Sequence, residues 1–81
     1  MKEDLSDRYE LLQRTLIKAR EDAGLSQQEV ARALGKHQTF VSKVERGERK
    51  LDVIEFIQMA KVLNFDPHIL IKRLQIIKQR R

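Results

Sequence analysis

Two four-residue stretches of this chain, SQQE at residues 26–29 and DVIE at residues 52–55, have the pattern of a capping box. In a capping box the first side chain accepts a hydrogen bond from the backbone of the fourth residue, and the fourth side chain accepts one from the backbone of the first. A third start signal is Asp66 before Pro67, because proline fits the first position of a helix. Apolar residues flank each signal at the spacing of a hydrophobic staple: Leu25 with Val30, Leu51 with Phe56, and Phe65 with Leu70. Three helix starts at short intervals predict a helical fold with sharp boundaries.

Apolar spacing and chain breakers predict two more helices and no strand. The first helix begins near Ser6 and ends at Gly24, and Gly35 allows a sharp turn between the second and third helices. Asn64 is expected to end the fourth helix, and the fifth is expected over about residues 66–78. Three apolar stripes are expected to face the core: Tyr9, Leu12, Leu16, Ala19 and Ala23; Val30, Ala31 and Leu34; and Ile57, Ala60 and Leu63. The predicted fold class is all-α, a compact five-helix bundle forming a single domain over residues 1–81.

Composition narrows the possible functions. The chain has 81 residues and no cysteine, and its two histidines, His37 and His68, lack metal-binding spacing. We therefore expect no metal and no cofactor, and no set of nucleophile and base points to an enzyme. No apolar run reaches the length of a membrane span, and the N-terminus is acidic where a signal peptide would be basic. We expect a cytoplasmic protein without a membrane partner.

Positive charge is concentrated after residue 31, most strongly in the middle of the chain, and residues 51–81 hold six Lys and Arg against three acids. Residues 32–50 hold six Lys and Arg against two acids, whereas residues 1–31 hold five against seven. Clustered cations favour a polyanionic partner, most often a nucleic acid, because binding phosphates releases counterions. The alternative is that these cations only solvate helices.

The third helix, in GKHQTFVSKVERG at residues 35–47, separates into two faces when projected at about 100° per residue. Phe40, Val41 and Val44 fall on the packed side. The other side contains no acid and consists of Gln38, Thr39, Ser42, Lys43 and Arg46. Such side chains match base edges in the major groove, and a capped helix, a tight turn and a second helix form the helix-turn-helix arrangement.

The stretch GLSQQEVARALGKHQTFVSKVERGERKLDVIEFIQMAKVLNFDP resembles the Cro/repressor, or XRE-type, helix-turn-helix family of transcriptional regulators over roughly residues 16–70. The resemblance implies a lambda-repressor-like bundle with the helix-turn-helix at about residues 26–46. It also implies sequence-specific binding to operator DNA, commonly as a homodimer acting as a repressor or autoregulator.

Matched position by position, the resemblance implies three groups of site residues. The base readers would be Gln38, Thr39, Ser42 and Lys43, and the phosphate contacts would be Gln27, Lys36, Arg46 and Arg49. Gln27 would also brace Gln38, the first glutamine of the recognition helix. Arg20 and Glu45 would form an internal salt bridge between the first and third helices. The projection supports this last role, since Arg20 lies only about 40° from Leu16.

Two residues depart from the family pattern. His37 stands where a hydroxyl residue often caps the third helix, and it is either a poor cap, a phosphate contact or a solvated side chain. Phe40 also replaces a hydroxyl residue. It either touches a thymine methyl group or closes the edge of the core.

The fifth helix carries more apolar residues than one core face needs. Leu70, Leu74 and Ile77 form a core stripe, whereas Ile69, Ile71 and Ile76 lie to either side of it. A second apolar strip predicts a homodimer interface and therefore a near-palindromic operator in double-stranded DNA. The alternative is that lysine and arginine stems cover this surface.

A protein-interaction module, such as an antitoxin or an adaptor on the same fold, is the alternative function. An antitoxin would normally carry an additional toxin-binding segment, and little chain is left over for one. Nothing in the sequence suggests a small-molecule ligand.

Overall fold

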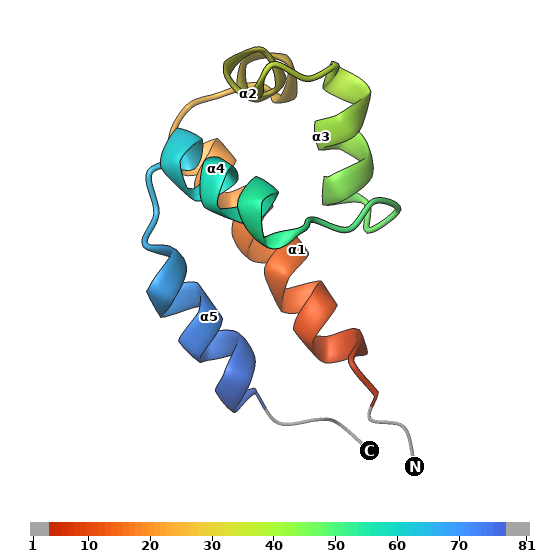
Figure 1. Ribbon diagram of the computed structural model, residues 1–81, viewed down its shortest axis with the longest axis vertical. Coiled ribbons are helices and arrows are strands. Elements are labelled where there is room, and N and C mark those ends of the chain that lie inside the picture. Colours follow the sequence, from red (N-terminus) through yellow and green to blue (C-terminus); the bar gives the residue numbers. More distant parts are fainter. Residues whose placement is uncertain (1–3, 78–81) are drawn as a thin grey trace.

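The computed structural model describes residues 4–77, and this part of the chain contains five helices and no strand. The helices are α1 (Ser6–Asp22), α2 (Gln27–Leu34), α3 (Gln38–Glu45), α4 (Val53–Leu63) and α5 (Pro67–Ile76). In Figure 1, α2 and α3 lie at one end of the molecule, α5 and the N-terminal half of α1 lie at the other, and α4 lies between the two ends. The predicted all-α class is confirmed.

The helices begin where the start signals place them. Ser26 Oγ accepts a hydrogen bond from the Glu29 N–H at 3.0 Å, and Glu29 Oε1 accepts one from the Ser26 N–H at 2.8 Å. The second capping box also forms, between Asp52 and Glu55. At α5 the Asp66 carboxylate accepts a hydrogen bond from the His68 N–H at 2.8 Å, with Pro67 in the first position. All three predicted helix starts are confirmed.

A left-handed glycine makes the turn between α2 and α3. Gly35 has φ of 69°, and the Lys36 N–H donates back to the Ala31 carbonyl oxygen at 2.9 Å. This closes α2 within one residue and lets the chain change direction at once. Figure 1 shows α2 almost end on while α3 runs across the view, so the two helices cross steeply.

The core lies between the first four helices. Its buried members come from all four: Leu16, Val30, Ala31, Val41, Val44, Met59 and Leu63. Two of them, Val41 and Val44, belong to α3, so the packed side of that helix is held in the core. The opposite side of α3 is thereby fixed facing outward.

The core stripe predicted for α4 was partly wrong. Ala60 and Leu63 are buried, but Ile57 is 51% exposed, and Met59 takes the place expected for it. Because α4 is apolar on most of its circumference, its sequence period did not identify the buried side. In α1 the stripe is buried at Leu16, whereas both ends of the stripe are exposed, at Tyr9 and Ala23.

The fifth helix is attached by fewer buried side chains. Leu70 is buried, Leu74 and Ile77 are half-buried, and the helix packs against α1 and α4. It ends at Ile76, so the prediction to residue 78 was too long by at least one residue, and residue 78 itself lies outside the described residues. Within residues 4–77, no helix has the length and apolar character needed to cross a bilayer.

Candidate nucleic-acid interface

The outward side of α3 presents polar and cationic side chains together. Gln38, Thr39, Lys43 and Arg46 are exposed, and Ser42 is half-buried. The Ser42 hydroxyl oxygen accepts a hydrogen bond from Arg46 Nη1. The structure therefore brings together the four residues expected to read bases, with Arg46 beside them.

On the α2 side of this face, a hydrogen bond fixes the first of these residues. Gln38 Nε2 donates to Gln27 Oε1 at 2.7 Å, and Gln27 Nε2 donates to Glu45 Oε1 at 2.8 Å. Within residues 4–77, Gln38 and Gln27 make no other side-chain hydrogen bonds. The side-chain oxygen and the second N–H of Gln38 are therefore available to another partner. Gln27 lies at the first position of α2 and connects Gln38 to the interior of the protein.

The chain of hydrogen bonds continues from Glu45 to Arg20. Arg20 donates from Nε to Glu45 Oε2 at 2.6 Å and from Nη2 to Glu45 Oε1 at 3.1 Å. Its Nη1 donates to the Leu25 carbonyl oxygen at 2.9 Å. The two side chains are 15% and 9% exposed, and the hydrogen bonds to Glu45 raise the pKa of Arg20. The ion pair expected between α1 and α3 is present, and it also holds the turn before α2.

On the opposite side of α3, the cations Lys36 and Arg49 meet one carboxylate. Arg49 donates from Nη2 to Glu55 Oε2 at 2.8 Å, and Lys36 Nζ lies 4.0 Å from the same oxygen. Hydrogen bonds from the Asp52 backbone and from Arg49 lower the pKa of Glu55, which therefore stays charged at neutral pH. Phosphate candidates thus lie on both sides of the face: Gln27 on the α2 side, and Lys36 and Arg49 on the α4 side.

An exposed acid, Glu48, lies beside Arg46. The guanidinium donates from Nε to Glu48 Oε2 at 2.8 Å, which raises the pKa of Arg46 and lowers the pKa of Glu48. Both side chains are more than half exposed. The pair is held weakly, because solvent screens it on both sides.

The two residues that depart from the family pattern have clear surroundings. His37 occupies the N-cap of α3 but makes no side-chain capping hydrogen bond. Phe40 is half-buried against the core, with Lys36 Nζ 5.2 Å and Arg49 Cζ 5.1 Å from its ring centroid. The structure therefore favours the reading of Phe40 as an aromatic that closes the core edge.

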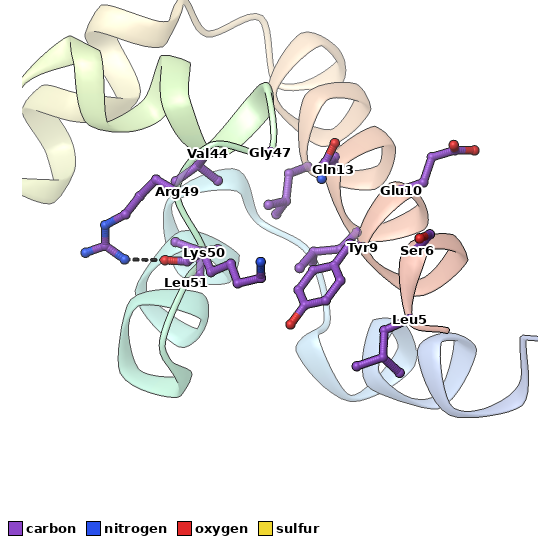
Figure 2. Close-up of a pocket in the computed structure, with 12 residues that line it drawn as sticks. Leu5, Ser6, Tyr9, Glu10, Gln13, Val44, Gly47, Arg49, Lys50 and Leu51 are labelled. Carbon is purple, nitrogen blue, oxygen red and sulfur yellow. Dashed lines mark hydrogen bonds between the residues drawn. The ribbon is translucent and has the colours of Figure 1, made fainter. Parts of the chain in front are cut away.

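A hollow of about 560 Å³ lies between α1 and the loop after α3 (Figure 2). Tyr9 and Leu5 border it on the α1 side, and Lys50 extends from the loop with its Nζ 4.6 Å from the centroid of the Tyr9 ring. Gly47 in this loop has φ of 79°, and a Cβ there would lie 2.6 Å from Gln13 Nε2. The left-handed φ favours glycine at this position, whereas the end of the Gln13 side chain is flexible and could move away from a Cβ.

Sequence reasoning missed Glu55 as a member of this region. Its spacing from Asp52 revealed the capping box, but its cationic partners are six and 19 residues away in the chain. No local pattern links residues at such distances. Only the folded arrangement, which places α4 near the two segments that flank α3, brings them together.

The residues expected at a dimer interface are accessible. Ile69 and Ile76 are 61% and 70% exposed, and Ile71 is also exposed. The N-terminal half of α4 adds Val53, Ile54 and Ile57 to the exposed apolar surface, which the sequence analysis did not predict.

These features define the class of the protein: α2, a tight turn and an outward polar α3 form a helix-turn-helix domain. Residues 16–70 match the helix-turn-helix family. The chain belongs to the XRE-type helix-turn-helix family, and at the level of the family it is a DNA-binding transcriptional regulator.

Solved structures with the same fold were found. An XRE-family like protein from Pseudomonas syringae pv. tomato str. DC3000 is 42% identical, with a TM-score of 0.83 over 91% of this chain and 90% of that chain. The restriction-modification controller protein C.AhdI from Aeromonas hydrophila is 29% identical, with a TM-score of 0.70 over 80% of this chain and 97% of its own. The hypothetical transcription factor NHTF from Neisseria is 29% identical, with a TM-score of 0.72 over 94% of this chain and 90% of that chain. A search of curated proteins found no match.

Proposed function

We propose that this protein binds a specific double-stranded DNA sequence with α3 in the major groove and acts as a repressor or autoregulator. The observation that carries the proposal is the fixed Gln38 amide at the edge of an acid-free outward face. A glutamine held in this way can offer an oxygen and an N–H together to one adenine. Lys43, one turn further along α3, suits guanine, and Thr39 and Ser42 suit either base.

The cations beside α3 supply the contacts that do not depend on sequence. Arg46, Lys36 and Arg49 would bind phosphates, together with Gln27 at the N-terminus of α2. Such contacts fix the position of the helix in the groove and make binding sensitive to salt.

We further propose that two copies bind together. The exposed Ile69, Ile71 and Ile76 on α5 would form the contact between them, and two recognition helices about 34 Å apart would then read a near-palindromic operator. The likeness to C.AhdI, a restriction-modification controller protein, supports a regulatory role.

The proposed base readers can be tested by alanine substitution after a preferred site has been selected from a random duplex pool. Gln38→Ala and Lys43→Ala should each weaken binding to the preferred site by about 1–3 kcal/mol and leave binding to random duplex almost unchanged. Arg46→Ala should weaken both alike. Fluorescence anisotropy on the two duplexes measures this difference.

The matched controls are Gln58→Ala and Lys61→Ala, which remove the same side-chain types from exposed positions on α4. Both should leave affinity for the preferred site unchanged. Equal loss on preferred and random duplex for Gln38→Ala would contradict the role of Gln38 in reading bases.

A further inference from the structure

The carboxylate of Glu55 has more than one task. It belongs to the capping box of α4, where Oε1 accepts a hydrogen bond from the Asp52 N–H at 3.0 Å. The same carboxylate accepts hydrogen bonds from both terminal nitrogens of Arg49, at 3.1 Å from Nη1 and 2.8 Å from Nη2. Its side chain is only 13% exposed. The capping box therefore holds the acid rigidly, and the acid in turn holds the arginine.

The cations at this carboxylate come from opposite ends of the recognition helix. Lys36 lies in the turn before α3, and Arg49 lies in the loop after it. Both also lie against the Phe40 ring, which belongs to α3 itself. We call these four residues, Lys36, Phe40, Arg49 and Glu55, the Glu55 cluster. It forms the α4 side of the recognition helix, opposite the Gln27 side.

The hydrogen bonds of Arg49 leave one edge of its guanidinium available. Nη1 donates to Glu55 and to the Lys50 carbonyl oxygen, and Nη2 donates once to Glu55. Arg49 Nε donates no hydrogen bond to any group within residues 4–77. The Nε–H and the second Nη2 hydrogen point the same way, as a pair that matches two oxygens of one phosphate.

The neighbouring residue, Lys50, points in a different direction from Arg49. In Figure 2 the side chains of Arg49 and Lys50 leave the loop in opposite directions, with Lys50 extending toward Tyr9 and Arg49 extending away from α1. The dashed line marks the hydrogen bond from Arg49 to the Lys50 carbonyl oxygen. The hydrogen bonds to Glu55 and to the Lys50 carbonyl oxygen therefore fix the direction of the Arg49 side chain.

We propose that Glu55 is a positioning residue, which holds Arg49 and Lys36 on the α4 side of the recognition helix so that they bind phosphates of one DNA strand. This inference rests on the proposed DNA-binding function and adds a residue that does not itself touch DNA. Arg49 presents the Nε–Nη2 edge to a phosphate while Glu55 retains the other edge. Lys36 adds a second charge next to it.

A purely electrostatic account predicts the opposite effect of Glu55. An acid close to a duplex repels phosphates, so its neutralisation should strengthen binding if charge alone matters. If Glu55 positions the cations, neutralisation should weaken binding. The sign of the change therefore separates the two accounts.

The test is Glu55→Gln, because glutamine can keep the capping box while losing the charge and the two-oxygen contact with Arg49. Binding to a short mixed-sequence duplex is measured by anisotropy over a series of potassium chloride concentrations. We expect E55Q to lose about fivefold to tenfold in affinity, in the range of the net contribution of one typical hydrogen bond. The salt slope should fall by about one unit, as for one lost phosphate contact.

Two variants serve as matched controls. Glu29→Gln changes the same position of the other capping box, where the carboxylate accepts a hydrogen bond from the Ser26 backbone, and it should leave duplex affinity unchanged. Glu48→Gln removes the exposed acid that pairs with Arg46, and it should bind as tightly as the unaltered protein or more tightly. Thermal melting of each variant checks that its fold is retained.

A double-mutant cycle assigns the effect to Arg49. In an Arg49→Ala background, Glu55→Gln should cause a much smaller further loss of affinity, because only Lys36 is then left for Glu55 to position. An E55Q protein that binds as well as or better than the unaltered protein overturns the inference, as does an equal loss in E48Q. If the unaltered protein binds no duplex at all, the proposed function fails together with the inference.

Discussion

At the scale of single residues, the recognition helix is held by an acid on each side. Glu45 is paired with Arg20 and with Gln27 on one side, and Glu55 is paired with Arg49 and Lys36 on the other. Both acids are nearly buried, whereas the cations differ: Arg20 is enclosed, and Arg49 and Lys36 are partly exposed. The pair on the α1 side therefore supports the fold, and the pair on the α4 side leaves charge at the surface.

The enclosed pair leads to a prediction about stability. Arg20→Ala should lower the free energy of unfolding by about 3 kcal/mol, because it leaves the Glu45 carboxylate without its main partner in a nearly buried site. It also removes the hydrogen bond to the Leu25 carbonyl oxygen. Urea unfolding followed by circular dichroism measures the change.

The control for this prediction is Lys18→Ala, which breaks the pair between Lys18 and Asp22 on the same helix. Both side chains of that pair are well exposed, so the loss should be about 0.5 kcal/mol or less. Similar losses in the two variants would show that Arg20 acts as an ordinary surface residue.

The residue contacts differ in how well the sequence predicts them. The role of Arg20 followed from a family resemblance together with its position near Leu16 on the helix projection. The roles of Gln27 and Gln38 also followed from the resemblance. Which of the two donates the hydrogen bond is known only from the structure. The contacts of Glu55 could not be predicted, because they depend on where the fold places α4 relative to the segments that flank α3.

At the scale of helices, the boundaries were the most predictable feature of the fold. Start and stop signals act between residues three or four apart, so the sequence contains all the groups involved. Both capping boxes and the stops at Gly35 and Asn64 are present, the latter two with φ of 69° and 58°. The buried side of α4 was less predictable, since several of its faces are apolar and only packing decides among them.

The capping box of α2 leads to a prediction about pH. The Ser26 backbone lowers the pKa of Glu29 below the ordinary value of about 4.3. The unfolded chain therefore takes up a proton before the folded protein does. The stability that Glu29 supplies is present above the ordinary value and is lost as the pH falls through the lowered one.

Glu29→Gln should therefore flatten the dependence of unfolding free energy on pH between about pH 5 and about pH 3. At neutral pH the amide can still accept the Ser26 N–H hydrogen bond, so the box itself can remain. Urea unfolding at a series of pH values makes the comparison. A pH profile that coincides with that of the unaltered protein would exclude a contribution from this carboxylate.

At the scale of the whole molecule, the two ends have different surfaces. The helices α2 and α3, at one end (Figure 1), present polar and cationic side chains, whereas α5, at the other end, presents three isoleucines beside the exposed cations Lys72 and Arg73. This separation suits a molecule that binds DNA at one end and a second copy at the other. It also agrees with the proposed near-palindromic operator.

A double substitution tests the second copy. Ile69→Lys combined with Ile76→Lys should yield monomers in sedimentation, because charge would have to be buried in the contact. The changes fall on exposed positions, so the fold itself should be retained. Val53→Lys, an equally exposed change on α4, should leave the dimer intact. An unaltered mass for the double variant would remove α5 from the proposed interface.

The hydrogen bond from Gln38 to Gln27 has an entropic consequence. A free glutamine side chain samples many rotamers, and restricting it on binding costs about 1–2 kcal/mol. In this protein folding has already restricted Gln38, through a neighbour that is itself tied to Glu45. The first side chain to meet a base would thus arrive with its rotamer selected, so its contact with adenine would lose little freedom and would penalise a mismatched base more fully.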